Sequence, residues 1–131
     1  MPYTRFVEIG RLALVQYGKE EGKLGFITEI IDTNHVIVDG PTTGLKKQVA
    51  KVSHLVLTPY KMKIPRNLRS TTLKKRIAKD DTLQKFQKSA WGMKLQKREI
   101  RSKLTDFQRF QVKCLKRIQR RMRKEEKSKK E

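Results

Sequence analysis

The sequence predicts an α+β protein in which a small, strongly bent β-barrel is followed by a basic helical extension. Short apolar runs separated by glycines occupy the first 60 residues, whereas no proline and a single glycine occur after residue 69. Residues 1–60 carry 7 Lys or Arg and 6 Asp or Glu, but residues 61–131 carry 26 and 7. We therefore expect a barrel over 1–60, a basic extended connector over 61–69, a helical extension over 70–124 and a disordered tail over 125–131.

Five short apolar runs predict the strands of the barrel. Two of them, Ile27–Ile31 and Val36–Val38, are rich in β-branched residues and predict a hairpin with a Thr33-Asn34 tip, where Asn34 can accept the positive φ that such a tip often needs. Five such strands within the first 60 residues are too few for a two-sheet sandwich but suit a small barrel with glycines at its corners. The runs are Phe6–Ile9, Leu12–Val15, Phe26–Ile31, Val36–Val38 and Leu55–Leu57.

Two prolines mark the change from strands to helices. Pro59 has no N–H to donate to a sheet, so Thr58-Pro59 is expected to end the last strand. Pro65 disfavours helix at the residue before it, which predicts an extended connector. This connector carries the cations Lys61, Lys63, Arg66 and Arg69.

The region from residue 70 to 101 has helical spacing, but its apolar positions change phase. The face that contains Ile77 differs by about half a turn from the face that contains Phe86. Asp81, followed three residues later by Gln84, resembles a capping box. The chain therefore either breaks near residues 80–82 or continues as one helix that different partners contact along its length.

The last helix is predicted to begin at a capping box formed by Thr105 and Gln108. Its apolar and basic residues separate onto opposite faces at helical spacing. Such a helix packs on protein with one face and binds phosphates with the other. The apolar stripe comprises Phe107, Phe110, Cys114, Leu115, Ile118 and Met122, and the basic face comprises Arg109, Lys113, Lys116, Arg120, Arg123 and Lys124.

Composition limits the class of protein further. Cys114 is the only cysteine, so no internal disulfide can form and a reducing compartment is expected. No apolar segment typical of a signal peptide follows the first six residues, and no run of 18 apolar residues predicts a membrane span. We expect a location in the cytosol or nucleus and no membrane partner.

The residue patterns that support enzymes are not found. The Gly18–Gly25 loop lacks the Gly-Lys-Ser/Thr order of a P-loop and precedes a strand, which favours a tight turn. His35 and His54 have no neighbours at metal-ligand spacing, and Asp80-Asp81 is better explained as a helix cap. Cys114 lies on an apolar stripe and is interpreted as a packed thiol. We therefore expect that the protein is not an enzyme and that it binds no metal, cofactor or small-molecule substrate.

Several segments resemble known proteins. The first segments resemble a KOW motif, which is the strand-loop-strand signature of SH3-like barrels in ribosomal and transcription-elongation proteins. They are Gly10–Val15, Gly18, Gly22–Gly25 and Ile27–Asp32. Further segments resemble the eukaryotic-type L-fourteen family of large-subunit ribosomal proteins. They are Val38–Pro41, Val56–Pro59, Ser89–Trp91 and Leu104–Val112. The similarity extends from about Val7 to Arg121.

The resemblance implies an SH3-like barrel of KOW type followed by helices that bind large-subunit ribosomal RNA. The implied partners are expansion-segment RNA and neighbouring large-subunit ribosomal proteins. The implied function is that of a structural constituent of the large ribosomal subunit that supports subunit assembly and translation, without catalysis. We accordingly expect the protein on cytoplasmic ribosomes, after passage through the nucleus and nucleolus during assembly.

The basic residues are the candidate RNA contacts, because 26 cations among few acids repel one another unless a polyanion is present. RNA is favoured over DNA, because the sequence contains no zipper, helix-turn-helix or zinc-finger pattern that would read a major groove. The expected RNA-binding residues are Arg11, Lys19, Lys23, Lys46, Lys47, Lys51, Lys61, Lys63, Arg66, Arg69, Lys74, Lys75, Arg76, Lys94, Arg98, Arg101, Arg109, Lys113, Lys116, Arg120, Arg123 and Lys124. The expected protein-packing residues are Trp91, Phe107, Phe110, Leu115 and Ile118, with base stacking as the alternative role of Trp91.

Other interpretations remain open at the level of sequence. A free KOW-type regulatory module would bind transcription or translation machinery mainly through protein, as a stable monomer with weak RNA affinity. A basic amphipathic helix also suits an anionic membrane or calmodulin, although neither partner explains the barrel.

Overall fold

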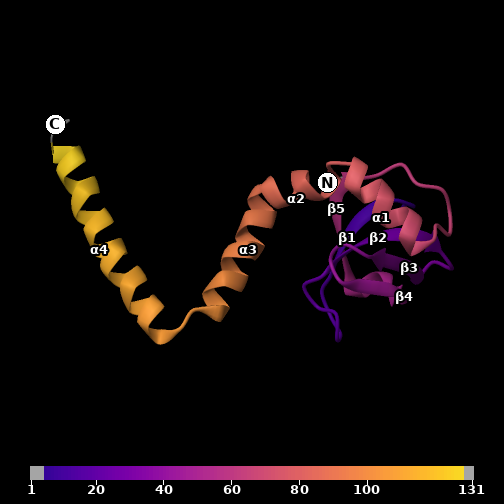
Figure 1. Ribbon diagram of the computed structural model, residues 1–131, viewed down its shortest axis with the longest axis horizontal. Coiled ribbons are helices and arrows are strands. Elements are labelled where there is room, and N and C mark those ends of the chain that lie inside the picture. Colours follow the sequence, from indigo (N-terminus) through magenta and orange to yellow (C-terminus); the bar gives the residue numbers. More distant parts are fainter. Residues whose placement is uncertain (1–4, 129–131) are drawn as a thin grey trace. The chain divides into compact units, whose positions relative to one another are not determined.

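The computed structural model describes residues 5–128 and contains a five-stranded antiparallel sheet followed by four α-helices (Figure 1). The α+β class predicted from the sequence is confirmed. The strands are β1 (Arg11–Val15), β2 (Leu24–Ile30), β3 (His35–Gly40), β4 (Leu45–Lys51) and β5 (Leu55–Lys61), with a short 3₁₀ helix, η1 (Val52–His54), before β5. They lie in the order β4-β3-β2-β1-β5.

The sheet bends because its strands carry irregularities. The pairing register shifts within three of the strand pairs, between Arg11 and Ala13, between Ile27 and Glu29, and between Val38 and Gly40. Bulges of this kind increase the twist of a sheet and let a short one curl. The sheet with its helical C-terminal part is consistent with an SH3-like barrel and a helical extension.

The barrel core consists of aliphatic and aromatic side chains from all five strands. Every residue of β1 is buried, as expected for a strand with a neighbour on each side. The side chains with the least exposure include Leu12, Phe26, Ile27, Val36, Val38 and Leu45. Burial of each such side chain stabilises the fold by about 1.5–3 kcal/mol.

The hairpin of β2 and β3 is confirmed, but its turn differs from the prediction. The Asp32 Oδ1 accepts hydrogen bonds from the backbone N–H of Asn34 at 2.7 Å and of His35 at 2.5 Å. This turn leaves Asn34 without the expected positive φ. Among the described residues other than glycine, only Asn67 has one, at 46°. The aspartate side chain therefore replaces the left-handed residue that many tight hairpins require.

Two strand predictions are wrong. Phe6–Ile9 is not a strand, and β4 supplies the fifth strand from a segment in which only Leu45 is buried. Sequence periodicity misses β4 because this edge strand presents mostly charged and polar side chains to solvent. Pro59 also does not end β5, which continues to Lys61. β5 is the outer strand beside β1, so a residue without an N–H is tolerated there.

The helices are α1 (Ser70–Lys79), α2 (Thr82–Lys88), α3 (Ala90–Lys103) and α4 (Asp106–Ser128). Of the two alternatives for residues 70–101, the structure has the break near residues 80–82 and not the continuous helix, and a further break occurs at Ser89. Asp80, and not the predicted Asp81, makes the side-chain bonds at the first break, because its Oδ1 accepts from the Thr82 N–H at 2.9 Å and from the Thr82 hydroxyl at 2.5 Å.

Helices α1 and α2 pack against the barrel. Leu73 and Ile77 of α1 are buried, and the Ser70 hydroxyl donates a hydrogen bond to the buried Asp39 carboxylate of β3 at 2.5 Å. Phe86 of α2 is buried and meets Tyr60 edge to face, with ring centroids 6.1 Å apart. The chain accordingly forms one compact unit up to Ser89 and a second from Ala90 onward. The first unit runs well past the boundary expected at residue 60.

Helix α4 continues beyond the expected boundary at residue 124. Glu125 and Glu126 belong to it, although the sequence predicted a disordered tail from residue 125. The rest of that predicted tail, residues 129–131, lies outside the described residues. Among the helices described here, none is long and apolar enough to cross a membrane.

Candidate nucleic-acid interface

Arg11 is buried, and its side chain makes its contacts within the chain. Its Nε donates to the Phe6 carbonyl at 3.0 Å, and its Nη1 lies 3.4 Å from the carbonyls of Thr58 and Pro59. The Glu8 carboxylate lies 3.5 Å away and offsets the charge. The guanidinium therefore joins the N-terminal segment to β5, because a buried cation needs these acceptors. An RNA contact by Arg11 stays a prediction.

The other predicted RNA contacts of the barrel are solvent-accessible, and Lys23 and Lys47 among them make contacts within the chain. Lys46, Lys47 and Lys51 are exposed on β4, and Lys47 donates to the Asn67 side chain at 2.8 Å. Lys19 is exposed in the loop after β1. Lys23 is ion-paired with Glu20 and donates to the Gly44 carbonyl at 3.2 Å. Strand β4 is thus the main basic element of the barrel surface.

The four cations predicted for the connector are all exposed, although Lys61 is the last residue of β5. Lys61 is paired with Glu8, and this hydrogen bond lowers the pKa of the Glu8 carboxyl below its usual value. Lys63, Arg66 and Arg69 are exposed without an ion pair among the described residues. Lys61 is therefore the one connector cation whose charge is already balanced within the chain.

Helix α1 carries three of the predicted RNA contacts on its exposed side. Lys74, Lys75 and Arg76 are all exposed, while Leu73 and Ile77 of the same helix point into the core. The Arg76 side chain donates to the Lys63 carbonyl at 3.3 Å, which ties the start of the connector to α1.

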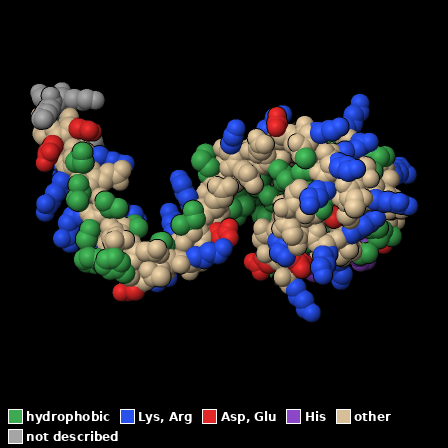
Figure 2. All heavy atoms as spheres, in the orientation of Figure 1, with side chains coloured by type: hydrophobic (Ala, Val, Ile, Leu, Met, Phe, Trp, Pro, Cys, Tyr) green, Lys and Arg blue, Asp and Glu red, His purple; other side chains and the backbone are tan. Residues whose placement is uncertain are grey.

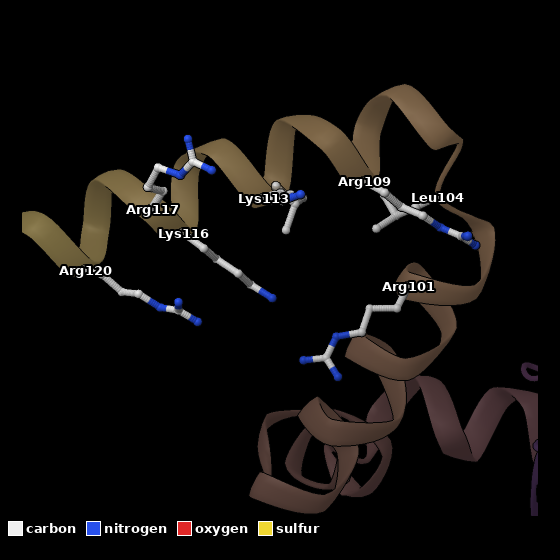
Figure 3. Close-up of a pocket in the computed structure, with 8 residues that line it drawn as sticks. Arg101, Leu104, Arg109, Lys113, Lys116, Arg117 and Arg120 are labelled. Atoms are coloured by element: carbon white, nitrogen blue, oxygen red, sulfur yellow. The ribbon is translucent and has the colours of Figure 1, made fainter.

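A basic cleft lies between the end of α3 and the first half of α4. It has a volume of about 560 Å³, and no acidic residue of the described part of the chain lines it. Figure 3 shows Arg101 of α3 and Lys116 and Arg120 of α4 extending toward the space between the two helices. The lining residues are Arg101, Leu104, Arg109, Val112, Lys113, Lys116, Arg117 and Arg120. We call this site the α3–α4 cleft.

The α3–α4 cleft brings together five of the predicted RNA contacts and one residue that the prediction missed. Arg101, Arg109, Lys113, Lys116 and Arg120 were expected, whereas Arg117 was not. Its position four residues after Lys113 places both on one side of α4, and this spacing could have identified it. The remaining helical candidates, Lys94, Arg98, Arg123 and Lys124, are exposed but do not line the cleft.

The start of α4 is fixed by the capping box that the sequence predicted. The Thr105 N–H donates to the Gln108 side chain at 3.0 Å, and the Gln108 N–H donates to the Thr105 hydroxyl at 3.4 Å. These reciprocal bonds satisfy backbone donors that a helix end leaves unpaired. They set where α4 begins and hence which of its residues line the cleft.

The apolar stripe of α4 is exposed in the isolated chain. Phe107, Phe110, Leu115 and Ile118 are between 53% and 66% exposed, and hydrophobic side chains form a row along α4 beside basic ones in Figure 2. Trp91 of α3 is half-buried. A stripe of this extent is unusual on a free monomer and is typical of protein-binding helices.

The two histidines lie at separate places in the barrel. The His35 Nδ1 lies 2.9 Å from the Asp32 carboxylate, and this hydrogen bond lowers the pKa of Asp32. His54 packs its ring against Tyr17 instead. Among the described residues, no group of three or more His, Cys, Asp or Glu side chains is placed to hold a metal.

Comparison with known proteins identifies the family. The family described as ribosomal protein L14 matches residues 46–121. The large ribosomal subunit protein eL14 of Schizosaccharomyces pombe is 40% identical over 90% of this chain and 88% of its own length. The proteins of the same name from Griffithsia japonica and Drosophila melanogaster are 43% and 38% identical, over 86% and 89% of this chain and 85% and 70% of their own lengths. These relatives are ribosomal structural proteins and not enzymes, in agreement with the prediction. The chain belongs to the eL14 family of large ribosomal subunit proteins.

Proposed function

We propose that this protein binds large-subunit ribosomal RNA and thereby supports assembly of the large subunit and translation. The observation that carries this proposal is the α3–α4 cleft, which gathers six cations and no acid. Arg101, Lys113 and Lys116 make no ion pair with the described residues. Their repulsion in the free chain is relieved when phosphates enter the cleft.

The chemistry of the cleft suits a folded RNA backbone. Arginine binds phosphate with two parallel N–H donors, and lysine acts as a point charge with a longer reach. Both contacts position the protein on RNA without reading its sequence. The exposed cations of β4, the connector and α1 extend this contact over the first unit, and Figure 2 shows basic side chains over both the barrel and the later helices.

The apolar stripe of α4 supports a second class of partner. Neighbouring ribosomal proteins would cover Phe107, Phe110, Leu115 and Ile118 while the basic side of the same helix contacts RNA, including expansion-segment RNA. The protein acts on cytoplasmic ribosomes after it has joined the subunit in the nucleus and nucleolus. Its contribution is to hold RNA and protein together, not to catalyse a reaction.

A matched pair of variants tests RNA binding at the cleft. Lys113→Ala with Lys116→Ala removes two cleft cations, whereas Lys85→Ala with Lys88→Ala removes two exposed cations of α2 that lie outside it. Both pairs have the same spacing on a helix, and alanine preserves helix formation. We expect the first variant to lose about tenfold or more in affinity for purified large-subunit ribosomal RNA, and the second to lose much less. Equal losses would contradict the assignment to the cleft.

A sucrose-gradient experiment tests association with the ribosome. The tagged protein should sediment with the large subunit from a cell lysate and stay bound at about 0.5 M salt, since contacts beyond diffuse charge hold a core component. Recovery at the top of the gradient at both low and high salt would overturn the ribosomal proposal and favour a free regulatory module.

A further inference from the structure

Two aromatic rings lie together on the surface where β1 ends and β5 begins. Tyr17 follows β1 and is 57% exposed, and His54, just before β5, is also exposed. Their ring centroids are 5.8 Å apart and their planes meet at 69°. An edge-to-face pair covers one face of one ring only, so open aromatic surface remains in solvent.

The backbone around this pair is well fixed. The Gln16 N–H donates to the His54 carbonyl at 2.8 Å, which joins the two segments. The Gly22 N–H donates to the Val15 carbonyl at 2.9 Å, so the loop after Tyr17 folds back onto the end of β1. A ring on such a scaffold loses little conformational freedom when a planar ligand stacks on it.

The local charge indicates that the rings, and not electrostatic attraction, would supply the binding energy. The loop carries Lys19 and Lys23 against Glu20 and Glu21, and Lys23 is paired with Glu20. This loop is therefore neutral in formal charge, unlike the lining of the α3–α4 cleft. An exposed aromatic ring in a nearly neutral part of a basic protein favours a planar, weakly charged ligand such as a nucleobase.

We propose that Tyr17 and His54 form a stacking site for an unpaired nucleobase of RNA, an inference that rests on the proposed RNA-binding function. Lys19 and Lys51, which lie within three residues of the two rings in sequence, supply charge for the phosphates that flank the base. For Trp91 the sequence favours packing over base stacking, and that side chain is half-buried, whereas Tyr17 is exposed. Direct stacking adds a contact that phosphate binding does not provide.

A comparison of two RNAs tests the stacking site on the full-length chain. The first is a uridine RNA of about 12 nucleotides, whose bases stack weakly on one another, and the second has the same backbone with abasic spacers. Fluorescence anisotropy measures both affinities. We expect the wild-type protein to bind the uridine RNA about 5- to 100-fold more tightly than the abasic one, since one base stack contributes this much.

Three variants separate the ring from the charge. Tyr17→Ala should bring the ratio of the two affinities close to one, and Tyr17→Phe should preserve it. Lys19→Ala should weaken both RNAs by the same factor and leave the ratio unchanged. Raising the salt concentration should lower both affinities in wild-type protein without changing their ratio. Circular dichroism verifies that each variant is folded.

The outcomes distinguish this site from the general proposal. If the wild-type protein binds both RNAs equally, or if Tyr17→Ala keeps the wild-type ratio, the stacking site is overturned while RNA binding stands. If it binds neither RNA, nor purified ribosomal RNA, the proposed function fails and the stacking site fails with it.

Discussion

At the scale of single residues, the structure separates cations by what surrounds them. Arg11 and Lys113 are both cations of a basic sequence. Arg11 of β1 is buried and bonds to backbone carbonyls of β5, whereas Lys113 lines an open cleft. A guanidinium in the interior must satisfy its donors, and here the chain supplies the acceptors from Phe6, Thr58 and Pro59. Sequence could not separate the two cases because those acceptors are distant backbone atoms.

Gly10 offers a test at the same scale. It has a φ of +84°, and a Cβ built there would lie 1.8 Å from the Met62 carbonyl oxygen. Gly10→Ala should therefore destabilise the barrel by about 2 kcal/mol or more, measured by urea unfolding, because the backbone at Met62, directly after β5, must move.

Gly22→Ala is the matched control for that substitution. Gly22 has nearly the same φ, +83°, but open space where the Cβ would lie. It should cost only the backbone strain of about 1 kcal/mol. Similar losses for the two variants would show that the close approach to Met62 does not constrain the fold.

At the scale of elements, amphipathic helices were predictable and edge strands were not. A capping box and a stripe of apolar residues, both of which are local patterns, predict helix α4. Strand β4 pairs with β3, where His35 lies opposite Lys51 at one end and Gly40 opposite Leu45 at the other. Only Leu45 of β4 is buried. Its backbone pairing, and not its hydrophobic pattern, makes it a strand.

The capping box predicts a measurable loss of helix. Thr105→Ala removes the hydroxyl that accepts from Gln108 and should destabilise the first turn of α4 by about 1 kcal/mol. Because α4 has its apolar stripe exposed, packing within the chain does not compensate for that loss. The far-ultraviolet circular dichroism of the full chain should show less helix. Thr105→Ser keeps a hydroxyl and should retain the wild-type signal; an unchanged signal in Thr105→Ala would contradict this role.

At the scale of the whole molecule, the folding unit is larger than the barrel. The Asp39–Ser70 hydrogen bond and the Tyr60–Phe86 contact join β3 and β5 to the first two helices. Burial of Leu73, Ile77 and Phe86 contributes about 1.5–3 kcal/mol each, which is comparable to the total stability of a small domain.

Truncation tests this boundary. A fragment of residues 1–89 should unfold cooperatively on heating, whereas a fragment of residues 1–62 should unfold at a much lower temperature or fail to fold. Calorimetry measures both transitions. Equal melting temperatures would show that α1 and α2 do not stabilise the barrel.

The sequence by itself determined the α+β class, the β2–β3 hairpin and the amphipathic capped helix α4, because each depends on residues close together in the chain. It also located the positive charge in the second half of the chain, since charge is a property of composition. Tertiary structure alone decided that Arg11 is buried, that β4 is a strand and that α1 and α2 belong with the barrel. These features depend on atoms brought together from distant segments, whose approach no local pattern encodes.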